Sequence, residues 1–126
     1  MLTGKCLCGA VTYEAREEPV FAFNCYCATC RRESGAGHLT IVSFKEKAVT
    51  FHGALKMIAP LRAEGAEPIP RFFCPSCGTT LFAKPTGDHG FVNVRAGTLD
   101  GIVALTIAGS EFTTHAQPWD QPVLDA

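Results

Sequence analysis

Short runs in which apolar and polar residues alternate, or in which aromatic residues gather, recur along the whole chain. Val, Ile, Thr and Phe are frequent in these runs, and such residues suit the half-buried surface of a strand. Gly and Pro separate many of the runs, as is typical of turns. The pattern predicts short strands at 10–15, 20–24, 38–44, 48–52, 55–58, 71–73, 80–83, 91–99 and 102–108.

Strands that are this short and this often interrupted favour antiparallel sheets over alternating strand and helix units, so the predicted fold class is mainly β. Two brief helical turns are expected. One covers 27–32, and the other begins after Ser43, a candidate N-cap. The segment 60–70 is rich in Pro, Ala and Glu and predicts a mobile surface loop.

The length and composition of the chain indicate one globular domain. A chain of 126 residues can bury one apolar core and is short for two, so we expect a single domain over residues 1–126. With 47% hydrophobic and 18% charged residues, the composition is not that of a disordered chain. The net charge is -1 and no basic run occurs, which disfavours nucleic acid as a partner.

No membrane partner is expected, because no window approaches the roughly 20 apolar residues of a membrane-spanning helix. The first ten residues, MLTGKCLCGA, lack the long apolar segment of a signal peptide. We therefore expect a cytoplasmic protein. Cytosolic thiols are kept reduced, so the seven cysteines, an odd number, are not expected to form a disulfide framework.

The cysteines fall into three groups, which are Cys6-x-Cys8, Cys25-x-Cys27-x2-Cys30 and Cys74-x2-Cys77. The last group has the spacing and the following Gly of a zinc knuckle. Cys6 and Cys8 can supply the second pair of thiolates, because alternate residues of a strand point to the same side. These four cysteines predict a closed, structural zinc site, since Zn²⁺ favours four tetrahedral ligands.

The remaining three cysteines, Cys25, Cys27 and Cys30, predict a second zinc site of a different kind. Three protein ligands with a vacant fourth position are typical of catalytic zinc, and this partition accounts for the odd number of thiols. An iron–sulfur cluster is less favoured, because the ferredoxin spacings are missing. Spacing alone leaves the grouping open, and the triplet could instead recruit a fourth ligand from Cys74, Cys77, His38, His52 or His115.

Five segments carry a resemblance to a known family. They are GKCLCGAVTYE, NCYCATCRRESGAG, RFFCPSCGTTLF, VNVRAGTLD and FTTHAQPW, in that order. Over nearly its whole length the chain resembles the glutathione-dependent formaldehyde-activating enzyme family, also called the GFA or CENP-V domain. The resemblance implies an Mss4-like (β-tent) fold of antiparallel sheets and few short helices, a structural zinc on Cys6, Cys8, Cys74 and Cys77, and a second zinc on Cys25, Cys27 and Cys30, where a thiol or thiol adduct reacts.

One position departs from the family pattern. Tyr26 stands where family members commonly have His, between the first two cysteines of the triplet. This difference concerns proton transfer or substrate contact rather than metal binding. Arg31 and Arg32 follow the triplet directly and are candidates for binding the carboxylates of glutathione through paired hydrogen bonds.

The implied function is that of a zinc-dependent carbon–sulfur lyase, similar to S-(hydroxymethyl)glutathione synthase. A metal ion with an open position deprotonates a coordinating thiol, and the thiolate attacks small electrophiles such as formaldehyde. Glutathione or another small thiol is the expected partner. The alternative is a non-catalytic zinc module that binds a protein partner or carries glutathione, because a fold does not determine a function.

Overall fold

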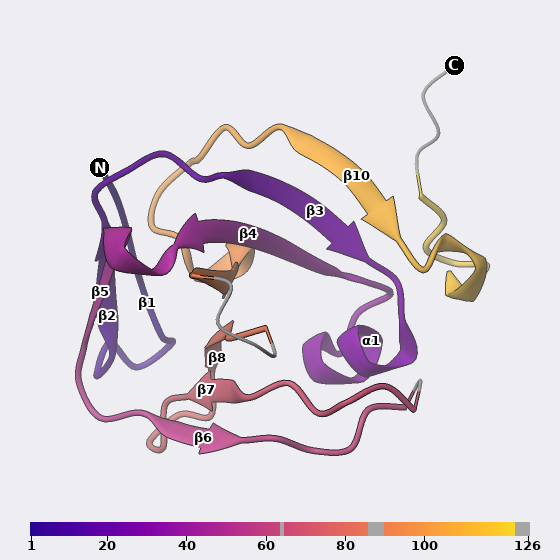
Figure 1. Cartoon of the computed structure of the whole chain (residues 1–126), viewed down its shortest axis with the longest axis horizontal. Helices are drawn as coiled ribbons and strands as arrows, with labels where there is room; N and C mark the ends of the chain where they lie inside the picture. Colours follow the sequence, from indigo (N-terminus) through magenta and orange to yellow (C-terminus); the bar gives the residue numbers. More distant parts are fainter. Residues whose placement is uncertain (64, 86–89, 123–126) are drawn as a thin grey trace.

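The computed structural model of the chain describes residues 1–63, 65–85 and 90–122. The described residues form two sheets (Figure 1). The smaller sheet has the strand order β1-β2-β5, with β1 at Leu2–Lys5, β2 at Thr12–Ala15 and β5 at Val49–His52. The larger sheet has the strand order β10-β3-β4-β9-β8-β7-β6. In that order its strands are β10 (Ile107–Glu111), β3 (Phe21–Cys25), β4 (Leu39–Lys45), β9 (Phe91–Arg95), β8 (Thr80–Ala83), β7 (Arg71–Phe73) and β6 (Lys56–Ile58).

The strand pairing confirms the mainly β prediction. The strands pair antiparallel throughout, except that β10 runs parallel to β3 at the edge of the larger sheet. The α-helix of the described chain, α1, spans Ala28–Ser34, close to the predicted turn at 27–32. Short 3₁₀ turns lie at Glu46–Ala48, Ala96–Thr98 and Thr113–His115. No helix among the described residues has the length and apolar character needed to cross a membrane.

Several predicted elements differ from the structure. The predicted strands did not include β1, and Cys6 and Cys8, expected to have the geometry of a strand, lie in the turn that follows it. The run 91–99 leaves the sheet at Arg95, and 102–108 becomes strand only from Ile107. Ser43 is not a helix cap, because it lies buried within β4 and its hydroxyl donates a 2.5 Å hydrogen bond to Asn93.

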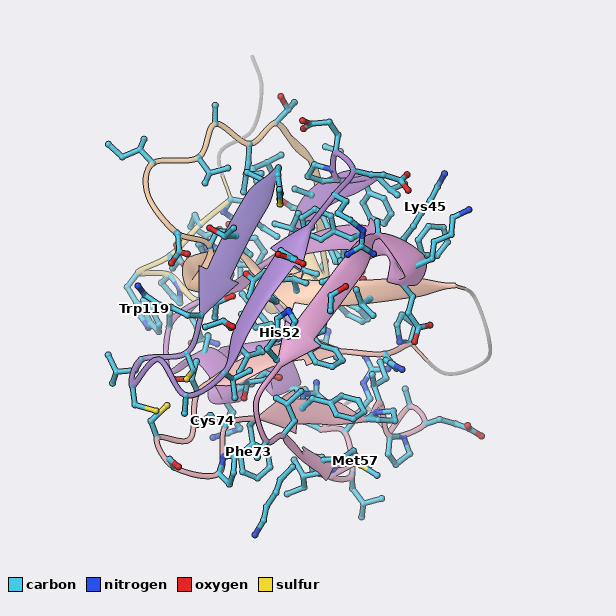
Figure 2. All side chains as sticks on the ribbon, turned by 90° about the vertical axis from the view of Figure 1, so that its left-hand side faces the viewer. Lys45, His52, Met57, Phe73, Cys74 and Trp119 are labelled. Carbon is cyan, nitrogen blue, oxygen red and sulfur yellow. The ribbon has the colours of Figure 1, made fainter. Side chains whose placement is uncertain are left out.

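The main core lies between the two sheets. Alternate residues of the larger sheet, including Val42, Val94 and Phe82, face the smaller sheet and pack with Val11 and Tyr13. Figure 2 faces the smaller sheet, whose strands lie in front of the larger one.

Three aromatic rings continue this core across the sheets. The ring of Phe82 stacks on Phe51 of β5, with centroids 4.1 Å apart, and on Phe72 of β7, with centroids 4.6 Å apart. Each such pair contributes about 0.5–1.5 kcal/mol beyond the burial of its area. The stack therefore helps to fix the smaller sheet against β7 and β8.

The helix α1 lies on the opposite face of the larger sheet. Phe23 and Ile41 of that face pack with the cysteines at the start of α1. The helix begins at Cys27, whose sulfur accepts a hydrogen bond from the Cys30 amide at 3.3 Å, and it ends at Gly35 with φ 69°. Glycine favours this left-handed conformation because it has no Cβ.

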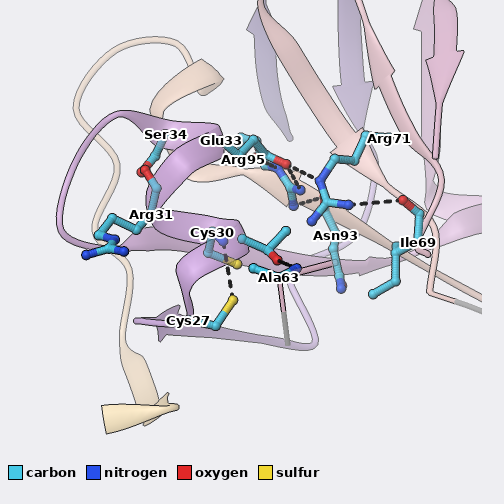
Figure 3. Close-up of polar contacts among 11 residues, drawn as sticks. Cys27, Cys30, Arg31, Glu33, Ser34, Ala63, Ile69, Arg71, Asn93 and Arg95 are labelled. Carbon is cyan, nitrogen blue, oxygen red and sulfur yellow. Dashed lines mark hydrogen bonds and ion pairs between the residues drawn. The ribbon is translucent and has the colours of Figure 1, made fainter. Parts of the chain in front are cut away.

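A buried ion-pair network fastens α1 to the larger sheet (Figure 3). Arg95 of β9 binds both carboxylate oxygens of Glu33, from Nε and from Nη2, each at 2.8 Å. Arg71 of β7 donates from Nε to the same carboxylate. Only 7% of Arg71 and 6% of Arg95 is exposed, so the network is shielded from water.

The loop between β6 and β7 packs against the same helix. The described residues of 60–70 belong to no helix or strand. The amide of Ala63 donates a 2.9 Å hydrogen bond to the Thr29 hydroxyl, which places this loop beside the start of α1. The mobility predicted for the segment stays a prediction.

The network yields a stability prediction. Glu33→Ala leaves two buried guanidinium groups without their carboxylate and is expected to lower the free energy of unfolding by about 3–5 kcal/mol, measured by urea denaturation in saturating Zn²⁺. The control is Glu17→Ala, because Glu17 pairs with Lys45 at 3.8 Å on the surface. That change is expected to cost less than about 1 kcal/mol. Equal effects of the two variants would contradict the structural role of Glu33.

Candidate metal centres

Four cysteines from the turns that follow β1 and β7 converge at one point. The sulfur atoms of Cys6, Cys8, Cys74 and Cys77 all lie within 4.8 Å of one another. Cys8 lies 3.7 Å from Cys6 and 3.8 Å from Cys74, sulfur to sulfur. Tetrahedral ligands at a metal–sulfur distance of about 2.3 Å lie about 3.8 Å apart. The four thiols could therefore hold one metal ion, and the structure brings together the four that the sequence grouped.

Two tight turns present these four thiols. Gly9 donates to the carbonyl of Cys6 at 3.1 Å, and Gly78 donates to that of Cys74 at 2.8 Å. Both glycines have positive φ, 80° and 81°, a conformation that other residues rarely adopt. A hydrogen bond from the Thr79 hydroxyl lowers the pKa of Cys77 to about 5, which favours the thiolate that a metal requires.

The second cluster lies where β3 passes into α1. Cys25 ends the strand, Cys27 caps the helix and Cys30 lies in its first turn. All three are buried, and their sulfur atoms lie within 4.8 Å of one another. No further His, Cys, Asp or Glu of the described chain joins this group. The triplet could hold a metal ion with one coordination position left open.

One thiol of the triplet loses its proton more readily than the other two. A hydrogen bond from Cys30 lowers the pKa of Cys25 to about 6, although burial opposes the ionised form. The same hydrogen bond raises the pKa of Cys30, and burial raises that of Cys27. Cys25 is therefore the thiol that ionises first.

The alternative ligands considered for the triplet lie elsewhere. Cys74 and Cys77 belong to the other cluster. His38 binds Asp120, His52 lies 4.0 Å from Glu14, and His115 packs on Phe112.

Tyr26, between two cysteines of the triplet, faces a cavity of about 590 Å³. Its buried ring lies 4.8 Å from the ring of His38, whose Nδ1 is 2.5 Å from Oδ2 of Asp120. A Cβ at Gly37 would lie 2.1 Å from the same oxygen, so glycine is needed for this approach. The His38–Asp120 pair was not predicted, because its members are 82 positions apart in the sequence.

Another cavity, of about 360 Å³, lies beside α1. Arg32, Glu33 and Arg71 line it together with residues of the loop after β6. Of the two arginines that the sequence singled out, Arg32 lies at this cavity and Arg31 is not part of its lining.

A mainly β scaffold that carries two cysteine clusters, one of four thiols and one of three, defines a protein with two candidate metal centres. The chain belongs to the glutathione-dependent formaldehyde-activating enzyme family, whose sequence profile matches residues 1–119. The family resemblance drawn from the cysteine motifs is thereby confirmed.

Two individual proteins are similar to this chain. A curated protein of Halomonas elongata is 34% identical over 86 residues, which make up 65% of this chain and 55% of that protein; its name provisionally describes a glutathione-dependent formaldehyde-activating enzyme. The chain thus spans little more than half the length of that relative. A crystal structure of a Rhodobacter sphaeroides protein matches with a TM-score of 0.62 at 22% identity, covering 80% of this chain and 90% of that one. This second likeness concerns the fold alone.

The two clusters should respond differently to the loss of a ligand. Cys77→Ser removes a thiol that joins the two sheets, and because binding to a structural metal site is part of the folding free energy, the variant is expected to unfold. Cys27→Ser should remain folded and lose one metal ion per chain. Circular dichroism and elemental mass spectrometry measure the two outcomes. A folded Cys77→Ser protein with the thermal stability of the wild type would count against a structural role.

Proposed function

We propose that the protein is a zinc-dependent carbon–sulfur lyase, similar to S-(hydroxymethyl)glutathione synthase, that acts on glutathione adducts of formaldehyde or another small aldehyde. The observation that carries the proposal is the pair of clusters, in which four thiols can close one tetrahedral site while three leave a position for a substrate sulfur. The family to which the chain belongs supports glutathione and formaldehyde as the substrate class.

The residues of the chain fit a zinc ion at both clusters, because thiolates at this spacing are preferred zinc ligands. Cys6, Cys8, Cys74 and Cys77 would hold the structural ion, and Cys25, Cys27 and Cys30 the second. When bound at the triplet, zinc supplies a Lewis acid and a site for sulfur.

The reaction itself balances without a redox partner. The thiol of glutathione loses its proton and its sulfur attacks the carbonyl carbon of formaldehyde. A carbon–sulfur bond forms as the carbon–oxygen π bond breaks, and the oxygen takes up one proton to give the hydroxymethyl group. The reverse reaction breaks the same bond. Burial of Cys25, Cys27 and Cys30 keeps competing water from the sulfur ligands. Three thiolates on Zn²⁺ carry a net charge of -1 and a fourth brings -2, so nearby cations favour the substrate complex. Arg31 and Arg32 are the cations that follow the triplet.

A second candidate function is that of a non-catalytic zinc module that binds a protein partner or carries glutathione. The observation that favours it is Tyr26, which occupies the position of a common family histidine and is buried against His38. A cytoplasmic location, in which glutathione is available to either function, remains a prediction.

Spectra of the cobalt-substituted protein distinguish the lyase from the non-catalytic zinc module. With Co²⁺ at both sites, glutathione is expected to change the visible spectrum of the wild type, because a new sulfur ligand enters the open position. Cys27→Ser should hold one metal ion and show no such change. The control ligand is S-methylglutathione, which has no free thiol.

The rate of adduct formation completes the comparison. The wild type should form S-(hydroxymethyl)glutathione from formaldehyde and glutathione at least about 100-fold faster than Cys27→Ser, since proximity and Lewis-acid effects each exceed this factor. A spectral response to glutathione without any rate enhancement would favour the carrier. One tightly held metal ion and no response to thiols would exclude the lyase.

A further inference from the structure

The ion-pair network beneath α1 carries more positive than negative charge. One carboxylate, that of Glu33, faces the two guanidinium groups of Arg71 and Arg95. The side chain of Glu33 is 11% exposed and those of the arginines are 8% exposed, so the imbalance lies out of bulk water. An unbalanced buried charge is costly unless another group pairs with it.

The two arginines bind the carboxylate of Glu33 with different numbers of hydrogen bonds. Arg95 binds it through two nitrogens. Arg71 gives it only Nε, and its Nη1 donates to the carbonyl of Ile69 at 3.1 Å (Figure 3). Among the described residues no acceptor lies on Nη2 of Arg71. The excess positive charge therefore lies on Arg71, whose Nη2 can still donate hydrogen bonds.

Arg71 lines the cavity of about 360 Å³ beside α1. Arg32 stands at the same cavity and forms no hydrogen bond or ion pair with any described residue. Thr29 adds a hydroxyl, and Ile58 and Leu61 form an apolar wall. Among the residues that the structure describes, the lining therefore carries two guanidinium groups against one carboxylate, and a ligand with one carboxylate and a short uncharged body complements it.

The cavity and the triplet share the helix α1. Thr29, Arg32 and Glu33 have the i, i+3, i+4 spacing of one helix face, and Cys30 lies among them in the same two turns. Figure 3 shows Cys30 and Glu33 projecting from this helix. With a rise of about 1.5 Å per residue, the two positions are about 4.5 Å apart along the helix axis. A molecule of the size of a tripeptide thiol spans such a separation.

We propose that this cavity is the carboxylate subsite of the thiol substrate, in which Arg71 and Arg32 bind a carboxylate while the sulfur lies at the triplet. The proposal rests on the proposed function for the place of the sulfur. It adds Arg71 of β7, which lies 41 positions beyond Cys30 in the sequence, to the expected binding residues of α1. Charge-assisted bonds from a planar guanidinium make the subsite selective for carboxylates.

Two small thiols test the subsite, because N-acetylcysteine has a carboxylate that N-acetylcysteamine lacks. Their affinities are measured from the visible spectrum of the cobalt-substituted protein. The wild type is expected to bind N-acetylcysteine at least about tenfold more tightly, as hydrogen bonds to charged groups allow. Arg32→Gln and Arg71→Lys should each reduce this preference several-fold, with circular dichroism confirming that both variants fold. Lys56→Gln, which removes an exposed cation on β6 outside the cavity lining, should leave the preference unchanged.

A second measurement keeps the subsite separate from the proposed function. In ¹⁵N-labelled, zinc-loaded protein, propionate is expected to shift the Nε–H resonance of Arg71, a probe that needs no thiol. If both thiols bind equally and propionate shifts nothing, the subsite is wrong while the lyase proposal stands. If propionate shifts Arg71 but no thiol alters the cobalt spectrum, the lyase proposal fails and the anion site remains. A preference for N-acetylcysteine that survives in Arg32→Gln and Arg71→Lys would also overturn the assignment.

Discussion

One buried carboxylate determines where α1 lies. Glu33 reaches from the helix to β9 and β7, and its bonds to Arg95 and Arg71 are the charged contacts that hold helix and sheet together. Such pairs contribute little net stability, because desolvation offsets most of the attraction, but they tolerate few alternative geometries. Since Cys27 and Cys30 belong to the same helix, the network also fixes the position of two thiols relative to Cys25 at the end of β3.

The two cysteine clusters use the same side chain in different local settings. The four-thiol cluster rests on two glycine turns and joins the smaller sheet to the larger one, so its ligands come from segments 66 residues apart. The triplet comes from six consecutive positions and joins nothing distant. A metal ion held at the first site would therefore tie the two sheets together, whereas an ion at the triplet would connect only neighbouring residues.

Local spacing explains what the sequence could predict. The triplet Cys25, Cys27 and Cys30 and most strands depend on neighbours within a few residues, and these predictions match the structure. The grouping of Cys6 and Cys8 with two cysteines some 66 positions away followed instead from the preference of zinc for four ligands. The end of β9 was missed because it depends on Thr98, which donates to the carbonyl of Arg95 at 2.7 Å and bonds Tyr13, 85 residues away, at 2.7 Å. Strand β1 was missed for a related reason. The Tyr13 ring occupies the place of a Cβ at Gly4, so packing requires a glycine there, and this glycine weakens the strand pattern in the sequence. The partners of Glu33 lie 38 and 62 residues away, beyond any local pattern.

Tyr26, which stands at a position where the sequence departs from the family pattern, lines the cavity that also holds His38 and Asp120. Side chains alternate along an extended chain, so Asn24 and Tyr26 line the cavity of about 590 Å³, whereas Cys25 and Cys27 are not part of its lining and gather with Cys30. Burial, and then the charge of Asp120, raise the pKa of Tyr26, so its phenol stays protonated and cannot serve as a base near neutral pH. The imidazole of this region stands at His38 instead, oriented by Asp120. Position 26 thus contributes to the cavity that holds His38 and Asp120, and the cluster of three thiols is formed by its neighbours in the chain.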